Sequence, residues 1–408
     1  MSKDALAVAV PPAPARSRRT LAACCGAHAL HDGFSDTLYV LFPVWQAAFG
    51  LSFAQVGLLK TLYSGSMAAL QVPASLAAER VGERVLLALG TLVAAAGFIA
   101  LGWTGGYAGL ALCLMLAGAG ASVQHPLGSA LTSRAFEGEK LRAALGTYNF
   151  SGDVGKMLLP ALCAALLAVL GWNAVTSLTG VLGLVAALAI WFAMPREPRR
   201  ADRAADVPDA PAGAPGVQGS ALANRGFVAL SAIGVIDSAT RMGFLTLLPF
   251  VLIAKGASVT QVGFALSLTF AGGATGKFFC GLIAGRVGVL RTTILTELAT
   301  AAGMVALLPL SLQGSLLLLP ALGVALNGTS SVLYGTVAEL VPTARRARAY
   351  GVFYTLTIGA GAVSPALYGL LGDAIGVPRT YAVIAAVVLL VLPLTLGLRP
   401  ALRALRPA

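Results

Sequence analysis

The sequence predicts an all-α integral membrane protein, with twelve transmembrane helices arranged as two pseudo-symmetric bundles of six. Three observations predict it: an apolar composition, long stretches without any charged residue, and short motifs that recur in two halves. The 408 residues are 57% hydrophobic and 11% charged, with a mean hydropathy of +0.84. Soluble domains carry about 25% charged residues, so a soluble fold is excluded.

The charge-free stretches fix the number of helices. Residues 85–133, 157–195 and 298–338 contain no Asp, Glu, Lys or Arg. A membrane-spanning helix needs about 20 residues, so each stretch holds two helices and a turn. Taken in order, the predicted spans are 21–47, 55–78, 85–104, 107–131, 143–168, 174–194, 226–253, 261–284, 292–311, 315–338, 349–371 and 380–398.

The distribution of basic residues predicts the topology. Most of the 28 lysines and arginines fall at span ends that share one side if both termini are cytoplasmic, as the positive-inside rule requires. The same rule explains the net charge of +12, so no nucleic-acid partner is expected. We expect a multi-pass protein of the bacterial inner membrane, a monomer in the lipid bilayer. Its predicted segments are a disordered cytoplasmic tail 1–20, a first bundle 21–194, a cytoplasmic linker 195–225, a second bundle 226–398 and a cytoplasmic tail 399–408.

An internal repeat divides the chain into two halves. Gln55-Val-Gly57 recurs 206 residues later as Gln261-Val-Gly263, and Pro43 recurs as Pro249 at the same offset. Pro160 recurs as Pro365 after 205 residues. Several matches in order at a nearly constant offset indicate two structural repeats of six helices, as in parallel-repeat transporters.

The loops that follow spans two and eight carry a recognisable motif. The first is Ser75-x-x-x-Glu79-Arg80-x-Gly82-x-Arg84, and the second copy includes Gly285-Arg286-Val-Gly288. This pattern resembles the loop signature of the major facilitator superfamily, Gly-x-x-x-Asp-Arg-x-Gly-x-Arg. The resemblance implies the major facilitator fold, and a cytoplasmic gate formed by Glu79, Arg80, Gly82, Arg84 and Arg286. The alternative is that these residues are only positive-inside anchors.

Within that superfamily, the first half resembles the fosmidomycin-resistance group of bacterial exporters. The residues that carry the resemblance are His31-Asp32, Pro43, Gln55-Val-Gly57, Gln71-x-Pro73 and Ser122-Val-x-His125-Pro126. It implies proton-coupled export of a small drug-like or anionic compound, with the proton gradient as energy source and no cofactor.

The first span has a polar face that includes His31, Asp32 and Asp36. Asp32 lies about 16 Å from the start of the span, near the bilayer midplane. Ionisable groups there are costly and usually functional. We therefore expect Asp32 to be the main proton-coupling carboxylate, with His31 and Asp36 assisting; His28, nearest the cytoplasmic end, is given no role. A purely structural network between helices is the alternative.

The seventh and eighth spans provide the opposite wall. Asp237 and Arg241 share one face through i,i+4 spacing. Arg241 is expected to neutralise Asp237, to pair across the cavity with Asp32 or Asp36, or to bind an anionic group of the substrate. Lys277 has no acid four residues away, so its partner must come from another helix. The predicted substrate contacts are Asp237, Arg241, Lys277, His125, Tyr39, Gln71, Gln124, Asn149 and Asn327.

Three further predictions concern the other charged residues and the fourth span. Asp153 and Lys156, at i,i+3 in the small-residue segment Gly152-Asp-Val-Gly155, are expected to form a local charge pair. Lys60 is expected to extend to the membrane surface from the outer end of span two. His125-Pro126 is expected to interrupt span four.

Other classes of function lack their residues in the sequence. It has no phosphate-binding loop, no nucleophile-base constellation and no cysteine pair with metal-ligand spacing. An enzyme, an ATP-driven pump and a metal site are therefore not expected. The prediction is a secondary transporter for a small molecule and protons that works by alternating access. Uptake of an organic acid or another small metabolite is the main alternative, and a non-transporting receptor or scaffold is a further one.

Overall fold

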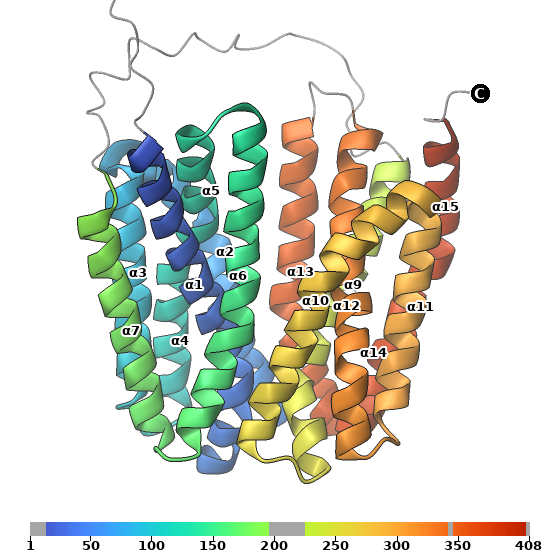
Figure 1. Ribbon diagram of the computed structural model, residues 1–408. Helices are drawn as coiled ribbons and strands as arrows, with labels where there is room; N and C mark the ends of the chain where they lie inside the picture. The colour runs from blue at the N-terminus through green and yellow to red at the C-terminus, as the bar shows by residue number, and fades with distance from the viewer. Residues whose placement is uncertain (1–13, 196–224, 342–345, 405–408) are drawn as a thin grey trace, which may run out of the picture.

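The computed structural model describes residues 14–195, 225–341 and 346–404, which form fourteen α-helices and no β-strand (Figure 1). The first half contains α1 (Pro14–Phe49), α2 (Phe53–Val81), α3 (Glu83–Leu101), α4 (Tyr107–Ala121), α5 (Gln124–Ala135), α6 (Gly138–Leu167) and α7 (Trp172–Ala193). The second contains α9 (Arg225–Ala254), α10 (Val259–Val287), α11 (Val289–Leu307), α12 (Leu312–Leu340), α13 (Arg346–Ile375), α14 (Val377–Leu389) and α15 (Val391–Ala404).

The fourteen helices make twelve spans, as predicted, because two of the spans each consist of two helices separated by a break. The fourth span consists of α4 and α5, and the twelfth of α14 and α15. Ten spans are long and apolar enough to cross a membrane by length and composition alone, and α1 and α2 complete the set. The break in the fourth span falls at Ser122–Val123, so Pro126 lies in the first turn of α5, where a missing N–H costs nothing.

The helices extend beyond the apolar stretches that predicted them. Residues 14–20, predicted to be disordered, belong to α1, and α15 continues through residues 399–404 of the predicted C-terminal tail. α1 alone has 36 residues, about 54 Å of helix, whereas the hydrocarbon core is about 30 Å thick. Residues 1–13, the linker from 196 to 224 and residues 405–408 lie outside the described part of the chain.

The sequence repeat corresponds to repeated backbone geometry. Ser52 and Gln55 form a capping box at the start of α2, and Ser258 and Gln261 form its counterpart at the start of α10. The turns before and after α2 contain Gly50 and Gly82 at positive φ, and so do their counterparts at 256 and 288. Positive φ is readily available to glycine. The recurring residues are therefore those that start helices and turn the chain.

The two halves contact each other through two reciprocal helix pairs, α2 with α13 and α6 with α10. A Cβ at Gly57 would lie 2.0 Å from the Pro365 carbonyl oxygen, and one at Gly263 would lie 3.0 Å from the Pro160 carbonyl oxygen. The repeated glycine of each half thus packs on the repeated proline of the other. These contacts lie near the α1–α2 turn at Gly50, which we call the far end of the bundle.

Toward the opposite end, the same helix faces separate. We call this the terminal end, because α1 begins there and α15 ends there (Figure 1). Gly146 lies two turns from Asp153 on the α10-facing side of α6, yet a Cβ there would have no atom within 4 Å. The same holds for Gly281 on α10 and Gly351 on α13. The structure is therefore closed at the far end and open toward the terminal end.

Candidate functional site

Asp32 is the centre of a charged cluster inside the first half. Its side chain is buried, and three basic groups from three helices reach its carboxylate. His28 Nε2 of α1 lies 3.3 Å from Oδ2, His125 Nε2 of α5 lies 3.6 Å from Oδ1, and Lys156 Nζ of α6 lies 3.2 Å from Oδ2. The midplane acid predicted from depth therefore has several partners.

Small residues of α6 make this cluster possible. A Cβ at Gly155 would lie 1.9 Å from the carbonyl oxygen of Ala29, and one at Gly152 would lie 2.6 Å from His28 Nε2. Larger residues would push α6 away from α1, so these glycines allow the close approach that brings Lys156 to Asp32. The expectation of close packing at this segment is confirmed.

The hydrogen bonds of His28 constrain where a proton can lie. His28 Nδ1 is 2.8 Å from the backbone carbonyl oxygen of Tyr148. A carbonyl only accepts, so Nδ1 must carry the hydrogen. In a neutral ring, Nε2 then presents a lone pair to the Asp32 carboxylate. A hydrogen bond between Nε2 and Asp32 therefore requires one further proton, on the ring or on the carboxylate.

His31 faces away from this cluster. Its Nε2 lies 2.9 Å from Thr91 Oγ1 on α3, and Thr91 donates its own hydrogen to the Leu87 carbonyl oxygen. His31 must therefore be the donor through Nε2, and its Nδ1 has no partner among the described residues. The structure brings together Asp32 and His28, whereas His31 packs α1 against α3. The i,i+4 spacing of His28 and Asp32 could have predicted their contact from the sequence.

Lys60 is buried, so the expectation that it extends to the membrane surface is wrong. Its Nζ donates to the backbone oxygen of Ser35 at 2.9 Å and to Ser35 Oγ at 3.0 Å, and lies 4.5 Å from the centre of the Tyr39 ring. These contacts hold the ammonium inside the bundle. Asp36, one turn from Asp32, is also buried, with no ion pair within the described residues.

Asp153 and Lys156 do not form the predicted local pair. Lys156 reaches Asp32, and Asp153 Oδ1 lies 2.5 Å from Lys277 Nζ on α10. The reason is that α6 packs between α1 and α10, so each side chain finds its partner on a different neighbour. The prediction that Lys277 pairs with another helix is confirmed. This ion pair joins the two halves of the molecule.

Three basic side chains of the charged network are accessible although they lie in the middle of their spans. The exposed fractions are 43% for His125, 30% for Lys156 and 38% for Lys277. They are therefore reachable from the open region between the halves.

In the second half, Asp237 and Arg241 line one small cleft without forming an ion pair in the part of the chain that is described. Arg241 Nη1 instead contacts Ser330 Oγ at 3.3 Å, and its Nε has no partner there. The closed intrahelical pair is thus not formed. Glu297 of α11 is buried, and its Oε1 is unpartnered within the described ranges.

The neutral polar candidates lie in different surroundings. Gln124 Nε2 donates to the Tyr148 hydroxyl at 2.8 Å, and Asn327 Nδ2 donates to the Gly323 carbonyl oxygen of its own helix at 3.2 Å. Gln71 is half-buried and Asn149 is exposed. Gln124 supports the tyrosine whose carbonyl binds His28, so its position is close to the cluster.

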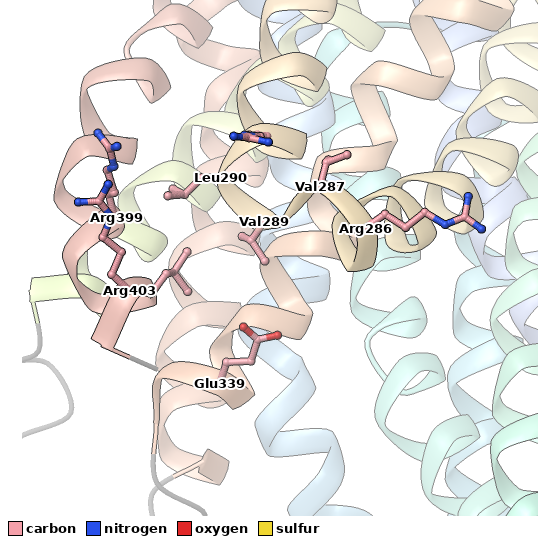
Figure 2. Close-up of a pocket in the computed structure, with 10 residues that line it drawn as sticks. Arg286, Val287, Val289, Leu290, Glu339, Arg399 and Arg403 are labelled. Carbon is pink, nitrogen blue, oxygen red and sulfur yellow. The ribbon is translucent and has the colours of Figure 1, made fainter. Parts of the chain in front are cut away.

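The predicted gate residues lie at the terminal end, and the contacts described for them lie within their own halves. Arg84 contacts Trp191 of its own half, with its guanidinium 5.0 Å from the ring centre, while Glu79 and Arg80 are exposed. Glu83, next to Arg84, pairs with Arg134 of α5. In the second half, Arg286 borders a separate cleft (Figure 2).

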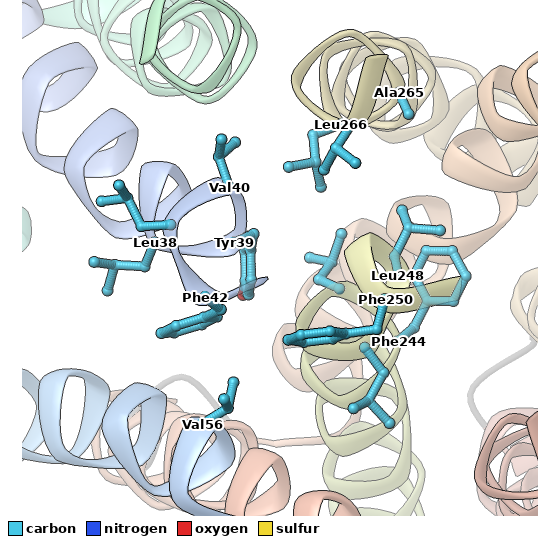
Figure 3. Close-up of a cluster of buried hydrophobic side chains, with 14 of the residues drawn as sticks. Leu38, Tyr39, Val40, Phe42, Val56, Phe244, Leu248, Phe250, Ala265 and Leu266 are labelled. Carbon is cyan, nitrogen blue, oxygen red and sulfur yellow. The ribbon is translucent and has the colours of Figure 1, made fainter. Parts of the chain in front are cut away.

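Tyr39 lies in the apolar contact between the halves. It is fully buried, and its hydroxyl lies 3.4 Å from Met242 Sδ of α9. Figure 3 shows Tyr39 and Phe42 of α1 facing Phe250 of α9 and Leu266 of α10. This apolar cluster closes the path from Asp32 to the far end.

His28, His125 and Asp32 could also hold a metal ion, because one ligand atom from each lies within 4.8 Å of the others. However, Lys156 already neutralises the carboxylate. An ammonium beside the site repels a second cation, so we assign no metal.

The fold and the cluster define a polytopic helical transporter made of two halves with ionisable groups between them. The family model of the Major Facilitator Superfamily matches residues 24–319 and 230–408, so the chain belongs to this family of secondary transporters.

Relatives with curated names agree with this assignment. An uncharacterized transporter of the same type, YfnC of Bacillus subtilis, is 24% identical over 372 residues, 88% of this chain and 87% of that one. The fosmidomycin resistance protein of Escherichia coli is 24% identical over 171 residues, 41% of this chain and 42% of that one. The probable L-galactonate transporter of Escherichia coli is 25% identical over 148 residues, 36% of this chain and 32% of that one.

Solved structures share the fold. A bacterial homologue of the human lysosomal transporter Spinster, in an inward-facing and occupied conformation, superposes with a TM-score of 0.78 at 16% identity, covering 96% of this chain and 99% of that one. The nucleoside transporter NupG gives a TM-score of 0.78 at 12% identity, covering 93% of this chain and 99% of that one.

Proposed function

We propose that this secondary transporter exports a small drug-like or anionic compound in exchange for protons. The observation that carries the proposal is the network Asp32–Lys156 and Asp153–Lys277, in which two acids and two lysines connect the proton site of one half to the other half. Asp237 and Arg241 contribute ionisable groups from the second half.

The coupling follows from competition for the lysines. Protonation of Asp32 removes the charge that holds Lys156. Lys156 then has Asp153 as the nearest acid on its own helix, three residues away. A carboxylate shared between two ammonium groups binds Lys277 less tightly. The halves can then separate at this level, so proton binding favours one conformation over the other.

The substrate class follows from the cations of the open region. Lys156 and Lys277 are exposed to it, and Arg241 has an unpartnered Nε among the described residues. Buried cations favour an anionic group as ligand. The likeness of the first half to a fosmidomycin resistance protein supports export of such a compound.

The test uses the full chain in proteoliposomes with an imposed pH gradient and fosmidomycin as probe. We expect uphill accumulation by the unmodified protein and a loss of at least about tenfold for Asp32→Asn, since the variant cannot exchange a proton. Thr147→Ala, at an exposed hydroxyl of α6 that donates to the Ala143 carbonyl oxygen of its own helix, is the control. Unaltered uphill transport by Asp32→Asn would contradict the coupling role.

Uptake of an organic acid is the second candidate. A probable L-galactonate transporter matches part of the chain, and the same cations suit a carboxylate. Proton-driven uptake of galactonate into right-side-out vesicles, without fosmidomycin export, would favour this candidate. No flux of either compound would favour a receptor or scaffold.

For the cellular arrangement we propose a monomer in the bacterial inner membrane with both termini cytoplasmic. The basic residues of the terminal end support this orientation. A reporter fused after Ala408 that is active only in the cytoplasm tests it, and activity of a periplasm-dependent reporter at that position would contradict it.

A further inference from the structure

A positively charged cleft lies at the terminal end of the second half, away from the transport network. It has a volume of about 680 Å³ and is bounded by the α10–α11 turn, the end of α12, and α15 (Figure 2). Four guanidinium groups and one carboxylate line it among the described residues; these are Arg286, Arg291, Arg399, Arg403 and Glu339. The side chains of Arg399 and Arg403 come from successive turns of α15 (Figure 2).

Within the residues that the structure describes, the guanidinium groups of this cleft are not paired with a carboxylate, although Glu339 lines the same cleft. In the described part of the chain, none of the four forms a hydrogen bond or an ion pair. The first half also has a cleft at this end, lined by Arg16, Arg19 and Arg84. There, however, Arg84 lies over Trp191, and the neighbouring Glu83 pairs with Arg134. The repeat offset of 206 places Val289 where the first half has Glu83, and the offset of 205 places Glu339 where it has Arg134. The turn between α10 and α11 therefore has no counterpart of the acid at Glu83.

General positive-inside charge explains why arginines occur at this end of the helices, but not why they gather around one cavity. Like charges that converge in a partly enclosed cleft repel each other. An anion that bound there would relieve this repulsion, and phosphate suits it because arginine binds phosphate oxygens in bidentate geometry.

The helix that provides two of the arginines also has an apolar surface in line with them. Leu389, Leu396 and Arg403 follow each other at intervals of seven residues, so they lie along one face of the twelfth span. Leu396 is 66% exposed and Leu389 is 36% exposed. The face therefore changes from exposed leucine to arginine at the end of the span, which matches the acyl chain and phosphate of a phospholipid.

We propose that this cleft binds an anionic phospholipid of the leaflet at the terminal end. Its phosphate lies between Arg399 and Arg403, and one acyl chain runs along Leu396 and Leu389. Glu339, the acid of the cleft, can accept a hydrogen bond from a headgroup hydroxyl. This favours phosphatidylglycerol over lipids whose headgroup has no hydroxyl. Basic pockets between membrane helices are known to bind lipid head groups in this way.

The test is a lipid titration of the full chain in detergent, with bound lipids counted by native mass spectrometry. The probes are phosphatidylglycerol, phosphatidylcholine and inorganic phosphate. The cleft variant is Arg399→Gln with Arg403→Gln. Its matched control is Arg18→Gln with Arg142→Gln, which removes the same charge from two exposed residues outside the cleft. We expect at least a tenfold weaker affinity for phosphatidylglycerol in the cleft variant, and less than a twofold change in the control.

The proposal would be overturned if the cleft variant retained phosphatidylglycerol as well as the unmodified protein does. It would also be overturned if the unmodified protein bound phosphatidylcholine and phosphatidylglycerol equally. Displacement of the lipid by an equal concentration of inorganic phosphate would identify a free anion as the ligand and would likewise overturn it. A melting temperature in detergent within two degrees of the unmodified protein establishes that a variant is folded. If the double variant is unstable, Arg403→Gln alone, in the last turn of α15, replaces it, with Arg142→Gln as control and a threefold loss of affinity expected.

Discussion

The bond from His28 to a main-chain carbonyl gives this histidine a different chemistry from His31, three residues away. The carbonyl of Tyr148 fixes one ring nitrogen of His28 as a donor and directs the other to Asp32. His31 has its donor on Thr91 and forms no ion pair with an acid among the described residues. Two histidines on one helix therefore divide into one that can exchange a proton with a carboxylate and one that holds two helices together.

Replacing each histidine by glutamine should separate these roles. His28→Gln removes the group that shares a proton with Asp32, so gradient-driven transport should fall at least about tenfold and lose most of its pH dependence. His31→Gln should keep the pH profile and lower stability by about 1 kcal/mol through the altered bond to Thr91. Transport rate against pH and the melting temperature measure the two effects. An unchanged pH profile for His28→Gln would contradict the assignment.

For single residues, the sequence predicted which charged side chains lie inside the bundle better than it predicted which side chains form ion pairs with each other. Asp32 could be found because depth and helical spacing depend on one helix alone. The partners of Lys156 and Asp153 could not, because they depend on which helices pack on either side of α6. Lys60 shows the same limit, since a lysine near a span end extends to the surface unless a neighbouring helix offers acceptors such as those of Ser35.

Among the helices, α6 occupies a special position because it contacts both α1 and α10. Its two charged side chains lie three residues apart and pair in opposite directions, one within the half and one across to the other half. In the proposed mechanism, α6 connects a change of charge at Asp32 to the ion pair of Asp153, because both partners lie on this one helix.

Exchanging the charges of Asp153 and Lys277 tests this arrangement. Asp153→Asn and Lys277→Gln each leave an unpaired charge, which costs about 3–5 kcal/mol where the pair is buried and less here because Lys277 is partly exposed. We expect each to reduce transport at least about tenfold. The double variant Asp153→Lys with Lys277→Asp should recover part of the rate. Transport in proteoliposomes measures this, and no recovery in a folded double variant would count against the ion pair.

The glycine at the start of α2 sets how closely the halves approach at the far end. In Gly57→Ala the new methyl group would lie 2.0 Å from the Pro365 carbonyl oxygen, so the helices must move apart. Overpacking of this kind costs about 1–3 kcal/mol. Gly65→Ala, in the same helix with no atom within 4 Å, is the control and should be neutral or stabilising, because alanine favours helix by about 1 kcal/mol. Melting temperatures that move in the same direction for both would contradict this account.

For the whole molecule, the far end is closed by apolar and backbone contacts, whereas the terminal end is open between α6 and α10. In alternating access the far end must open while the terminal end closes, and the reverse. The far end is held by the Tyr39 cluster, by the glycine-proline contacts, and by Asp373 of α13, whose carboxylate accepts hydrogen bonds from the backbone N–H groups of Phe53 and Ala54 at the start of α2. In the proposed mechanism the charge change acts at the middle level, where Lys277 meets Asp153.

Cysteine pairs can follow this exchange. With the five native cysteines replaced, Gly146→Cys with Gly281→Cys should cross-link slowly in the open state and faster when the terminal end closes. In the structure Ser267 Oγ of α10 donates to the Met157 carbonyl oxygen of α6 at 2.6 Å. The pair Met157→Cys with Ser267→Cys should therefore cross-link fast in the open state and more slowly when the terminal end closes. Cross-linking rates with and without a pH gradient measure both. Rates that rise together would contradict a rocking motion of the halves.

More of the fold than of the candidate site could be predicted from the sequence. Twelve spans and two halves follow from hydropathy and a repeat, both of which are properties of single segments. The ends of α1 and α15 were missed because a helix continues into water for as long as its own hydrogen bonds favour it. The break at Leu390 in the twelfth span was missed as well, although Pro393 lies in the first turn of α15 just as Pro126 lies in the first turn of α5.

The reciprocal glycine-proline contacts have a consequence for how the chain is joined. They lie at the far end, whereas the segment that connects the two halves leaves and enters at the terminal end. The connection and the interface are therefore independent, and the halves recognise each other through complementary surfaces that each carries in its own sequence. A chain cut within 196–224 and produced as two polypeptides should then assemble into one transporter, as two subunits of a heterodimer do.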